Sequence, residues 1–397
     1  MRPITGEFRA NLFPPRPKFA TIRFFKIVSL SLPEIACRLM RCPAAPYHES
    51  FVAAEVICIC KDAGLIVETD SFDNILVRLP NAPSGRPFVL AAHLDHPAFV
   101  IREPKNLEAE FLGGVGDEYF CLGATLRLFP GAIKARLGPR ISPDKRLFQI
   151  VAEEPIVEEP SFAVWDLPSF EVQDDRVSGR ACDDLIGAAT ALHVLANLKE
   201  SGTSTNVIAV LSRAEEVGLH GALALAGSGL LPPDSLVISL ETSRELPPVK
   251  MGQGVIIRVG DRASIFDSAF TRYLTEVATD FAKVDARFKF QRALMSGGTC
   301  EATAYQECGY RSAAICVALG NYHNCGANHK IEPEFVSLAD AMWMSQLLER
   351  SAVERPNFDA LANRLPQRLC RSSVEAVRDL TSKRLSICGA SPSEFVK

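Results

Sequence analysis

The chain has 397 residues, of which 47% are apolar and 23% are charged, a composition typical of a soluble globular protein with a large buried core. The net charge of -4 argues against nucleic acid and against an anionic membrane surface as partners. No apolar run reaches the ~20 residues that a membrane-spanning helix needs, so we expect no membrane contact and a cytoplasmic location.

The first elements along the chain are helices and a buried strand. Residues 1–28 are basic and proline-interrupted, and we expect a disordered extension or an artefact of start-site choice rather than a signal peptide. Residues 31–42 and 48–63 have apolar residues at helical spacing. "NILVRLP" alternates like a strand, and "RPFVLAAHLDH" has the continuous apolar run of a strand buried on both faces.

Residues 99–175 differ in character from the rest of the chain. Glycine and proline become frequent, and short alternating segments such as "ATLRLF" and "RLFQIVAEE" lie between turn signals. This pattern predicts a small all-β domain inserted into a larger α/β domain formed by 29–98 and 176–352.

After this region, strands and helices alternate. "DDLIGAATALHVLANLK", "GALALAGSGL" and "EFVSLADAMWMSQLLER" have helical patterns, whereas "TNVIAVLS", "DSLVISLE", "GVIIRVG" and "SAAICVALG" have strand patterns. The alternation predicts the α/β class, with a mostly parallel mixed sheet flanked by helices. Residues 353–397 form a basic, partly helical C-terminal extension.

The twelve cysteines do not form a recognisable metal module. No two of them are separated by two residues, as in cysteine zinc sites, and most lie in apolar stretches such as "EVICIC". We interpret them as buried, reduced residues of a cytosolic protein.

Acidic and imidazole side chains follow several predicted strands. These side chains are His93 and Asp95, Glu215 and Glu216, Glu241 and His323, and the helix after "RACDD" adds Asp183 and Asp184. Ligands of parallel sheets bind beyond the carboxyl ends of the strands, so we expect these groups to meet at one edge. Because converging carboxylates in a cleft are unfavourable unless compensated, a divalent cation would explain them.

Each of these residues also has an ordinary structural explanation. His93 could be a hydrogen-bonded surface histidine, Asp183 or Asp184 could be a helix N-cap, and Glu241 could face solvent. His329 lies close enough to His323 in sequence to be a rival ligand. The joint placement at strand ends favours a site over these separate explanations.

Five segments, taken in order, resemble the di-metal aminopeptidases of the tetrahedral-aminopeptidase and glutamyl-aminopeptidase type. "AAHLDHPAFVI" resembles their His-x-Asp-Glu-Ile-Gly-Phe segment, and "VSGRACDDLIGAAT" their Gly-x-x-x-Asp-Asn/Asp-Arg-x-Gly segment. "AEEVGLHGA" is similar to their Glu-Glu-Val-Gly-x-x-Gly-Ala, "SGGTCEA" to Gly-Gly-Thr-Asp-Ala, and "GNYHN" to their final histidine segment. His93 and Asp183 lie 90 positions apart, and among zinc exopeptidase-like folds the resemblance implies a small β-barrel-like domain inserted just there in this group. The simpler aminopeptidases lack that insert, and the carboxypeptidase-like and deacylase relatives place their extra domain later in the chain.

The resemblance implies a role for each matching residue. Asp183 would bridge two divalent ions, zinc first and cobalt or manganese as alternatives. His93 and Glu241 would complete one ion, and Glu216 and His323 the other. The general base would be Glu215. Asp95 would hold the other ring nitrogen of His93.

Some residues depart from the family pattern. Glu241 stands where the group has Asp, His96 replaces a Glu, Leu185 replaces an Arg and Cys300 replaces an Asp. These departures leave the ligand set intact and bear on substrate preference and assembly, which the resemblance implies is a homo-oligomer.

Three functions are consistent with the residues and the resemblance. The first is a metal-dependent aminopeptidase that acts on short peptides. The second is a related di-metal amide hydrolase, such as a deacylase or dipeptidase. The third is a non-catalytic metal-binding protein, which the presence of Glu215 disfavours because a structural metal site needs no base.

Overall fold

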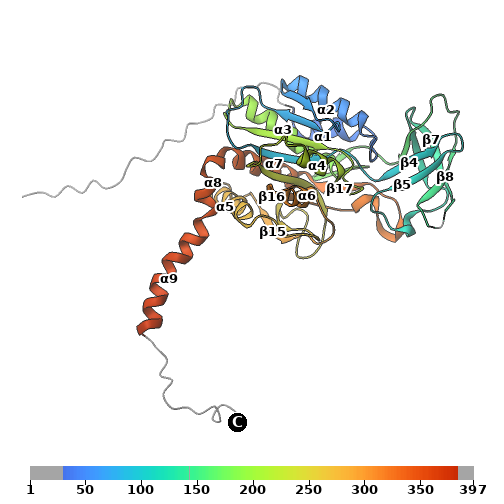
Figure 1. Cartoon of the computed structure of the whole chain (residues 1–397). Helices are drawn as coiled ribbons and strands as arrows, with labels where there is room; N and C mark the ends of the chain where they lie inside the picture. Colours follow the sequence, from blue (N-terminus) through green and yellow to red (C-terminus); the bar gives the residue numbers. More distant parts are fainter. Residues whose placement is uncertain (1–29, 143, 383–397) are drawn as a thin grey trace, which may run out of the picture.

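The computed structural model describes residues 30–142 and 144–382 (Figure 1). The predicted extension at 1–28 lies outside these residues. No helix among the described residues is both long enough and apolar enough to cross a membrane.

The centre of the molecule is an eight-stranded mixed sheet, which confirms the predicted α/β class. Its strands, in spatial order, are β1 (Ile66–Thr69), β2 (Ile75–Arg78), β12 (Val207–Ser212), β3 (Phe88–His93), β13 (Leu236–Arg244), β16 (Arg311–Leu319), β14 (Val255–Gly260) and β15 (Phe290–Leu294). The four central strands, from β12 to β16, are parallel to one another, whereas β1, β2 and β14 add antiparallel pairs. The carboxyl ends of the central strands therefore lie at one edge.

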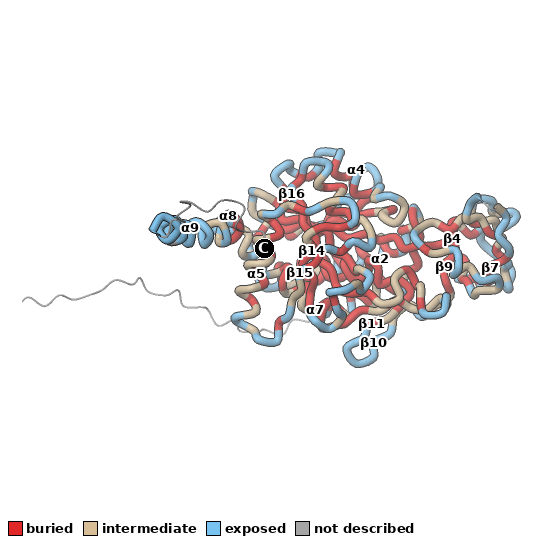
Figure 2. Tube along the Cα trace, turned by 90° about the horizontal axis from the view of Figure 1, so that it is seen from below, coloured by how far each residue is buried: buried red, intermediate tan, exposed pale blue. Residues whose placement is uncertain are grey.

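Helices cover both faces of this sheet. On one face lie α1 (Leu32–Met40), α2 (Ser50–Ala63), α3 (Leu185–Glu200), α5 (Ser268–Val284) and α7 (Leu338–Glu354). On the other lie α4 (His220–Ser228) and α6 (Glu301–Glu307). Alternate residues of the central strands pack into the two layers, and every residue of β3 and β12 is buried, as expected for strands covered on both sides (Figure 2).

A closed barrel follows β3 directly and forms a lobe beside the sheet (Figure 1). It contains β4 (Ala98–Glu103), β5 (Glu108–Leu112), β6 (Thr125–Phe129), β7 (Ile133–Arg140), β8 (Leu147–Ala152) and β9 (Phe162–Trp165). Its core is aromatic: Phe99 packs edge-on against Phe111 and Trp165. The short helix η1 (Asp117–Tyr119) follows β5 and faces the sheet side of the barrel, near η3 (Ala327–His329).

One predicted helix begins later than expected. Residues Glu334–Ser337, assigned to the last large helix, instead form β17, which pairs with β11 (Arg176–Gly179), and β11 pairs with β10 (Glu171–Gln173). Glu334 and Val336 are buried while Phe335 between them is half-exposed, so a period of two, not helical spacing, governs these residues. The described C-terminal residues continue as η4 (Arg355–Asn357), α8 (Phe358–Ala362) and α9 (Arg364–Ser382).

Candidate metal centre

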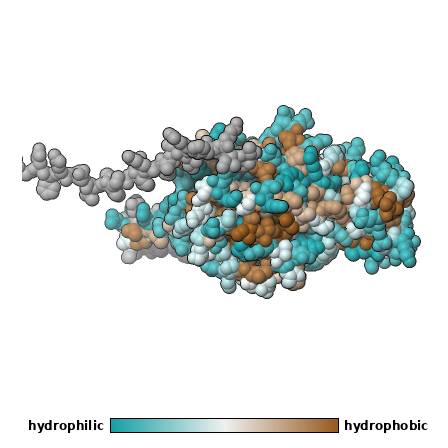
Figure 3. Space-filling view, turned by 90° about the horizontal axis from the view of Figure 1, so that it is seen from above, coloured by the Kyte–Doolittle hydropathy of each residue, from teal (hydrophilic) through white to brown (hydrophobic). Residues whose placement is uncertain are grey.

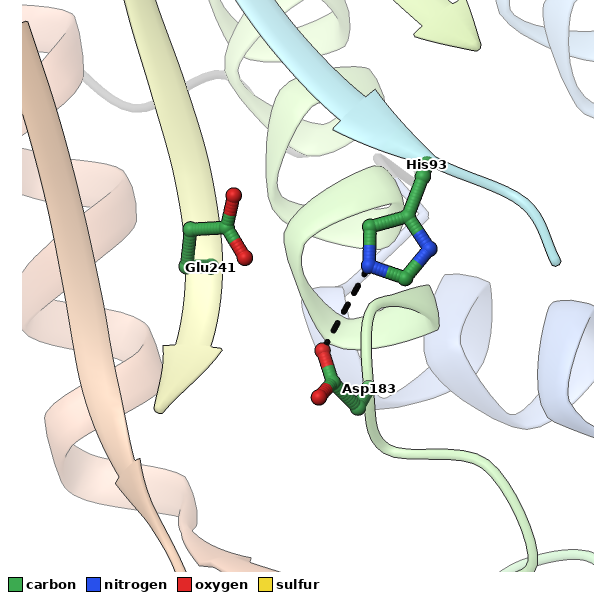
Figure 4. Close-up of side chains that lie close together, drawn as sticks. All are labelled: His93, Asp183 and Glu241. Carbon is green, nitrogen blue, oxygen red and sulfur yellow. Dashed lines mark ion pairs between the residues drawn. The ribbon is translucent and has the colours of Figure 1, made fainter. Parts of the chain in front are cut away.

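His93, Glu241 and Asp183 converge at the carboxyl edge of the central strands (Figure 4). His93 is the last residue of β3, and the pairing of Ser239 with Ala91 places Glu241, two residues further along β13, level with it. Asp183 comes from the segment that enters α3, and its Oδ1 lies 3.5 Å from Nε2 of His93. All three side chains are buried.

A second group forms on the other side of Asp183. Its Oδ2 lies 3.6 Å from Nε2 of His323, and that nitrogen lies 3.1 Å from Oε1 of Glu216. The residue His323 belongs to η2 (Tyr322–Asn324), in the loop after β16, and Glu216 belongs to the loop after β12. The two carboxylate oxygens of Asp183 thus face two different histidines, which is the arrangement of a bridging ligand.

The donor set fits a pair of cations. Oδ1 of Asp183 and Oε1 of Glu216 are buried oxygens without a hydrogen-bond donor. Possible ligand atoms form three groups of three residues, and within each group these atoms lie within 4.8 Å of one another. Besides Asp183 and Glu216, the groups contain the carboxylates of Glu215 and Glu241 and the imidazoles of His93 and His323. Buried carboxylates without donors are unfavourable, whereas carboxylate oxygen and imidazole nitrogen are ligands that zinc, cobalt and manganese accept.

Backbone carbonyls fix which nitrogen of each histidine faces the centre. Nδ1 of His93 lies 3.1 Å from the carbonyl oxygen of Asp95, and Nδ1 of His323 lies 2.8 Å from that of Gly114 in the barrel. A carbonyl only accepts, so each Nδ1 carries a hydrogen, and in the neutral ring Nε2 is the nitrogen free to bind a cation placed among the carboxylates.

Asp95 acts on the centre in more than one way. Oδ1 of Asp95 lies 3.5 Å from Nδ1 of His93, as expected. The backbone carbonyl oxygen of Asp95 lies closer to the same nitrogen, at 3.1 Å. The same carboxylate accepts hydrogen bonds from the backbone amides of Glu215 (2.9 Å) and Glu216 (3.1 Å). It therefore also holds the backbone of the two adjacent glutamates.

Glu215 stands beside the ligand group without completing either trio around Asp183. Its Oε2 lies 3.9 Å from Nε2 of His93. Burial raises the pKa of Glu215 well above its usual value, and the neighbouring carboxylates of Glu216 and Glu241 raise it further, against the effect of His93. Such a carboxyl has a higher proton affinity than an exposed one and borders the cavity described below.

Sequence reasoning missed Glu334, which is fully buried and accepts three backbone hydrogen bonds. Its Oε2 takes those of Cys182 (2.8 Å) and Asp183 (3.0 Å), and its Oε1 takes that of His323 (2.7 Å). One carboxylate thus ties together the segments that carry the shared aspartate and the last histidine. No motif in the sequence marks this residue, which was assigned to a helix.

The other candidate residues lie around the centre or away from it. His96 contacts the carbonyl of Asp183 (2.8 Å) and Oδ1 of Asn324 (3.1 Å), so it supports the ligand loops. Leu185 is buried in α3, and Asp184 caps this helix by accepting from the amide of Gly187. His329 is exposed against Tyr119 and belongs to none of the ligand groups.

A cavity of about 640 Å³ opens onto the ligand groups. The barrel contributes Glu118 and Tyr119 to its wall, and Cys300 also lines it. Three arginines line it as well: Arg244, Arg258 and Arg262. Arg258 is buried, donates to Oγ of Ser243 (3.2 Å), and has no partner at Nε.

Comparisons with known proteins identify similar folds and a matching family model. Residues 151–331 match the model of the M42 glutamyl aminopeptidase family. The Pyrococcus horikoshii TET1 peptidase, described as able to assemble into a tetrahedron or a large octahedral shell, is 22% identical, with a TM-score of 0.67 over 82% of this chain and 100% of its own. A TET aminopeptidase from a marine sediment thaumarchaeote is 22% identical (TM-score 0.66; 81% and 96% covered), and a Desulfurococcus kamchatkensis aminopeptidase is 20% identical (TM-score 0.65; 81% and 94% covered). At these identities the structural likeness establishes a shared fold.

Proposed function

We propose that this chain, a metallo-aminopeptidase of the M42 type, releases N-terminal residues from short peptides with Glu215 as the general base. The observation that carries the proposal is the position of Asp183, whose two oxygens face His93 and His323, with Glu215 at the edge of the same group. A site that only stored metal would have no use for a further buried carboxyl beside its ligands.

We assign two divalent cations to the centre, zinc first, with cobalt and manganese as alternatives. His93, Asp183 and Glu241 would hold one ion, and Asp183, Glu216 and His323 the other. When bound, such cations supply Lewis acidity toward water and toward the scissile carbonyl.

The residues of the chain then move the proton. Glu215 accepts a proton from the attacking water and returns it to the leaving amine. Burial raises the pKa of Glu215 above its usual value, which makes its carboxylate a stronger base than an exposed one. Asp95 keeps the glutamate in place through the backbone, because its carboxylate accepts the amide hydrogens of Glu215 and Glu216.

The arginines of the cavity favour substrates that carry a carboxylate. Arg258 is buried with an unpartnered Nε, and a guanidinium binds a carboxylate better than any other side chain does. We therefore assign a preference for acidic N-terminal residues. The change Arg258→Met is expected to lower kcat/KM for glutamyl substrates more than for leucyl substrates, and equal losses for both would remove this assignment.

One experiment separates the three candidate functions. Protein loaded with zinc, cobalt or manganese is assayed on aminoacyl p-nitroanilides, on N-acetylated amino acids and on free dipeptides, with released p-nitroaniline or newly formed free amine as the readout. An aminopeptidase cleaves only the free amines, whereas a deacylase requires the acylated ones and a dipeptidase requires a free α-carboxyl. No turnover on any substrate, with metal bound, would leave the non-catalytic metal-binding protein.

We also assign a homo-oligomeric state and a separate inserted domain at residues 99–175. The relatives with this fold include one described as a dodecamer, and a broad apolar area occupies the middle of the face seen from above (Figure 3). The free cysteines among the described residues support a cytoplasmic protein, and the net charge of -4 argues against nucleic-acid and anionic-membrane partners. Light scattering of the purified chain tests the oligomeric state.

A further inference from the structure

A buried glutamate outside the metal centre contacts the loop that carries Glu215. Glu49 precedes α2 as its N-cap residue, yet its side chain makes no cap hydrogen bond to that helix. It is 1% exposed, and its carboxylate reaches a segment 165 positions further along the chain. A buried carboxylate that is not used by its own helix needs another function, and its contacts indicate one.

The carboxylate of Glu49 binds the start of the 213–219 loop at two points. Its Oε1 accepts the backbone amide of Ala214 (3.0 Å), and its Oε2 lies 2.7 Å from Nε of Arg213. The same guanidinium donates to the carbonyls of Phe72 (3.1 Å) and Tyr47 (3.0 Å). Glu49 is therefore joined to the loop both by an amide and by an arginine that also contacts the segment of Phe72. The Tyr47 carbonyl, and the Tyr47 amide that Oε1 also accepts (2.8 Å), belong to the segment of Glu49 itself.

The loop has a backbone that needs such contacts. Ala214 has φ 53° and Leu219 has φ 61°, in the left-handed region that residues with a Cβ rarely adopt. A single residue held there costs on the order of 1–3 kcal/mol unless its surroundings determine it. The amide of Ala214, immediately before the glutamates, is the one that Glu49 accepts.

Glu49 and Asp95 together accept three consecutive amides. Glu49 accepts that of Ala214, and the two oxygens of Asp95 accept those of Glu215 and Glu216. The direction of a side chain depends on its backbone, so these contacts set where the Glu215 carboxyl points. Asp95 reaches the loop from the end of β3, whereas Glu49 reaches it from the segment between α1 and α2.

We propose that Glu49 is a positioning residue for the general base, because it holds the left-handed residue that precedes Glu215. The proposal rests on the proposed function for its catalytic meaning. The alternative is that Glu49 only stabilises the fold, by linking the N-terminal helices to β12 through Arg213. The two differ in what happens to the loop and to turnover when the carboxylate is changed.

The test uses Glu49→Ala and Glu49→Gln in the full chain. The control is Asp267→Ala, because Asp267 also accepts a backbone amide, that of Phe270 at 2.6 Å, but at the start of α5. Hydrogen–deuterium exchange of the peptide covering 211–219 is measured without substrate, together with bound metal, kcat and KM. Glu49→Gln keeps one acceptor oxygen and is the variant of choice should Glu49→Ala not fold.

The proposal predicts exchange of the loop amides about five- to tenfold faster in Glu49→Ala, with a smaller change in Glu49→Gln and none in Asp267→Ala. It also predicts a kcat lowered about 10- to 100-fold with KM within about twofold and metal content unchanged. Wild-type exchange rates in both Glu49 variants would overturn it, as would a kcat loss no larger than that of Asp267→Ala. Hydrogen–deuterium exchange is measured without substrate and does not depend on activity. If the wild-type protein proved inactive, the proposed function would be wrong, but the exchange rates would still show whether Glu49 holds the loop.

Discussion

The two halves of the candidate metal centre are built in different ways. His93 and Glu241 stand on β3 and β13, neighbouring parallel strands whose register brings the two side chains level. Glu216 and His323 stand on loops, and His323 itself has φ 55° in the left-handed region. The first half follows from strand pairing alone, whereas the second exists because buried carboxylates hold the loop backbones.

The difference shows what each half depends on. Moving His93 requires disrupting fully buried strands of the central sheet. The position of His323 depends on the amide that it donates to Glu334 and on the carbonyl of Gly114 that its ring contacts. We therefore expect the His93 half to be robust to substitutions outside the ligands and the His323 half to be sensitive to them.

The largest effect should come from the residue that both halves share. In Asp183→Ala, both ions lose a ligand, so we expect bound metal to fall from two ions toward none and turnover to fall by about 10⁴-fold or more. Metal is measured by atomic emission after gel filtration. Asp184→Asn is the matched control, because it keeps the cap on α3 and should retain both ions. A variant of Asp183 that binds two ions would contradict the bridging role.

Glu215→Gln should remove the base and leave both halves assembled. We expect metal content to be unchanged and kcat to fall about 10²- to 10⁴-fold, because the proton transfer in the transition state is lost. Glu215→Asp keeps a carboxylate on a shorter arm and should retain part of the activity. Near wild-type turnover in Glu215→Gln would exclude it as the base.

Glu334→Gln should weaken one half more than the other. The Glu334 carboxylate accepts the backbone N–H groups of Asp183 and His323 on its two oxygens. A glutamine has only one oxygen there, and its NH₂ group cannot accept, so these segments would be held less firmly. We expect one ion to bind about 10- to 100-fold more weakly and the other to change less. Metal titration by calorimetry resolves the two sites. Ser239→Ala, which removes the 2.7 Å hydrogen bond to Glu241, is the counterpart on the other half. If each variant lowered the affinity for both ions equally, the two halves would not depend on different residues, contrary to this prediction.

The smallest effect concerns a buried histidine without carboxylate partners. Glu215 and Asp183 raise the pKa of His93 well above its usual value despite its burial, whereas burial alone lowers the pKa of His193 to about 4. The folded protein thus binds fewer protons at His193 than the unfolded chain between pH 6.5 and 4, so stability should fall as the pH drops through this range. The expected slope is up to about 1.4 kcal/mol per pH unit.

Urea unfolding of the wild type and of His193→Gln at a series of pH values measures this slope. Glutamine does not titrate and can still contact Ser345, whose Oγ lies 2.8 Å from Nδ1 of His193. The stability difference between the two proteins should change with pH only below about 6.5. A constant difference from pH 7 to 4 would show that His193 is not buried in its neutral form.

The sequence predicts the strand-borne half and the fold that supports it. The apolar run before His93 predicts that it ends a buried strand, and the strand pattern before Glu241 predicts that it lies late in another, which in the structure continues to Arg244. The alternation of elements predicts the parallel centre. Glu216 and His323 also follow predicted strands, but no pattern predicts the loop conformations that carry them, and the ligand roles of all these residues came from the family resemblance. The structure brings all the predicted ligands together, while their roles stay predictions.

The buried carboxylates that hold the loops could not be predicted. Glu334 was assigned to a helix, because "EFVSLADAMWMSQLLER" has helical spacing overall and only its first four residues alternate. Glu49 lies before a helix, where an acid is usually a cap, and its partner is more than 160 residues away. Contacts of this kind are set by tertiary structure, and a single sequence carries no periodic signal for them.

The hydrogen bond between His323 and Gly114 limits how far this chain can be made smaller. The acceptor is a backbone carbonyl of the barrel lobe, so it survives point substitutions there but not removal of the lobe. If only the central sheet and its helices were kept, Nδ1 of His323 would lose this acceptor. The imidazole ring could then rotate, or carry its hydrogen on Nε2 instead of Nδ1. Engineers who seek a minimal version would therefore have to supply a replacement acceptor there, and grafting a foreign barrel would succeed only if the loop after its second strand presented a carbonyl in the same place.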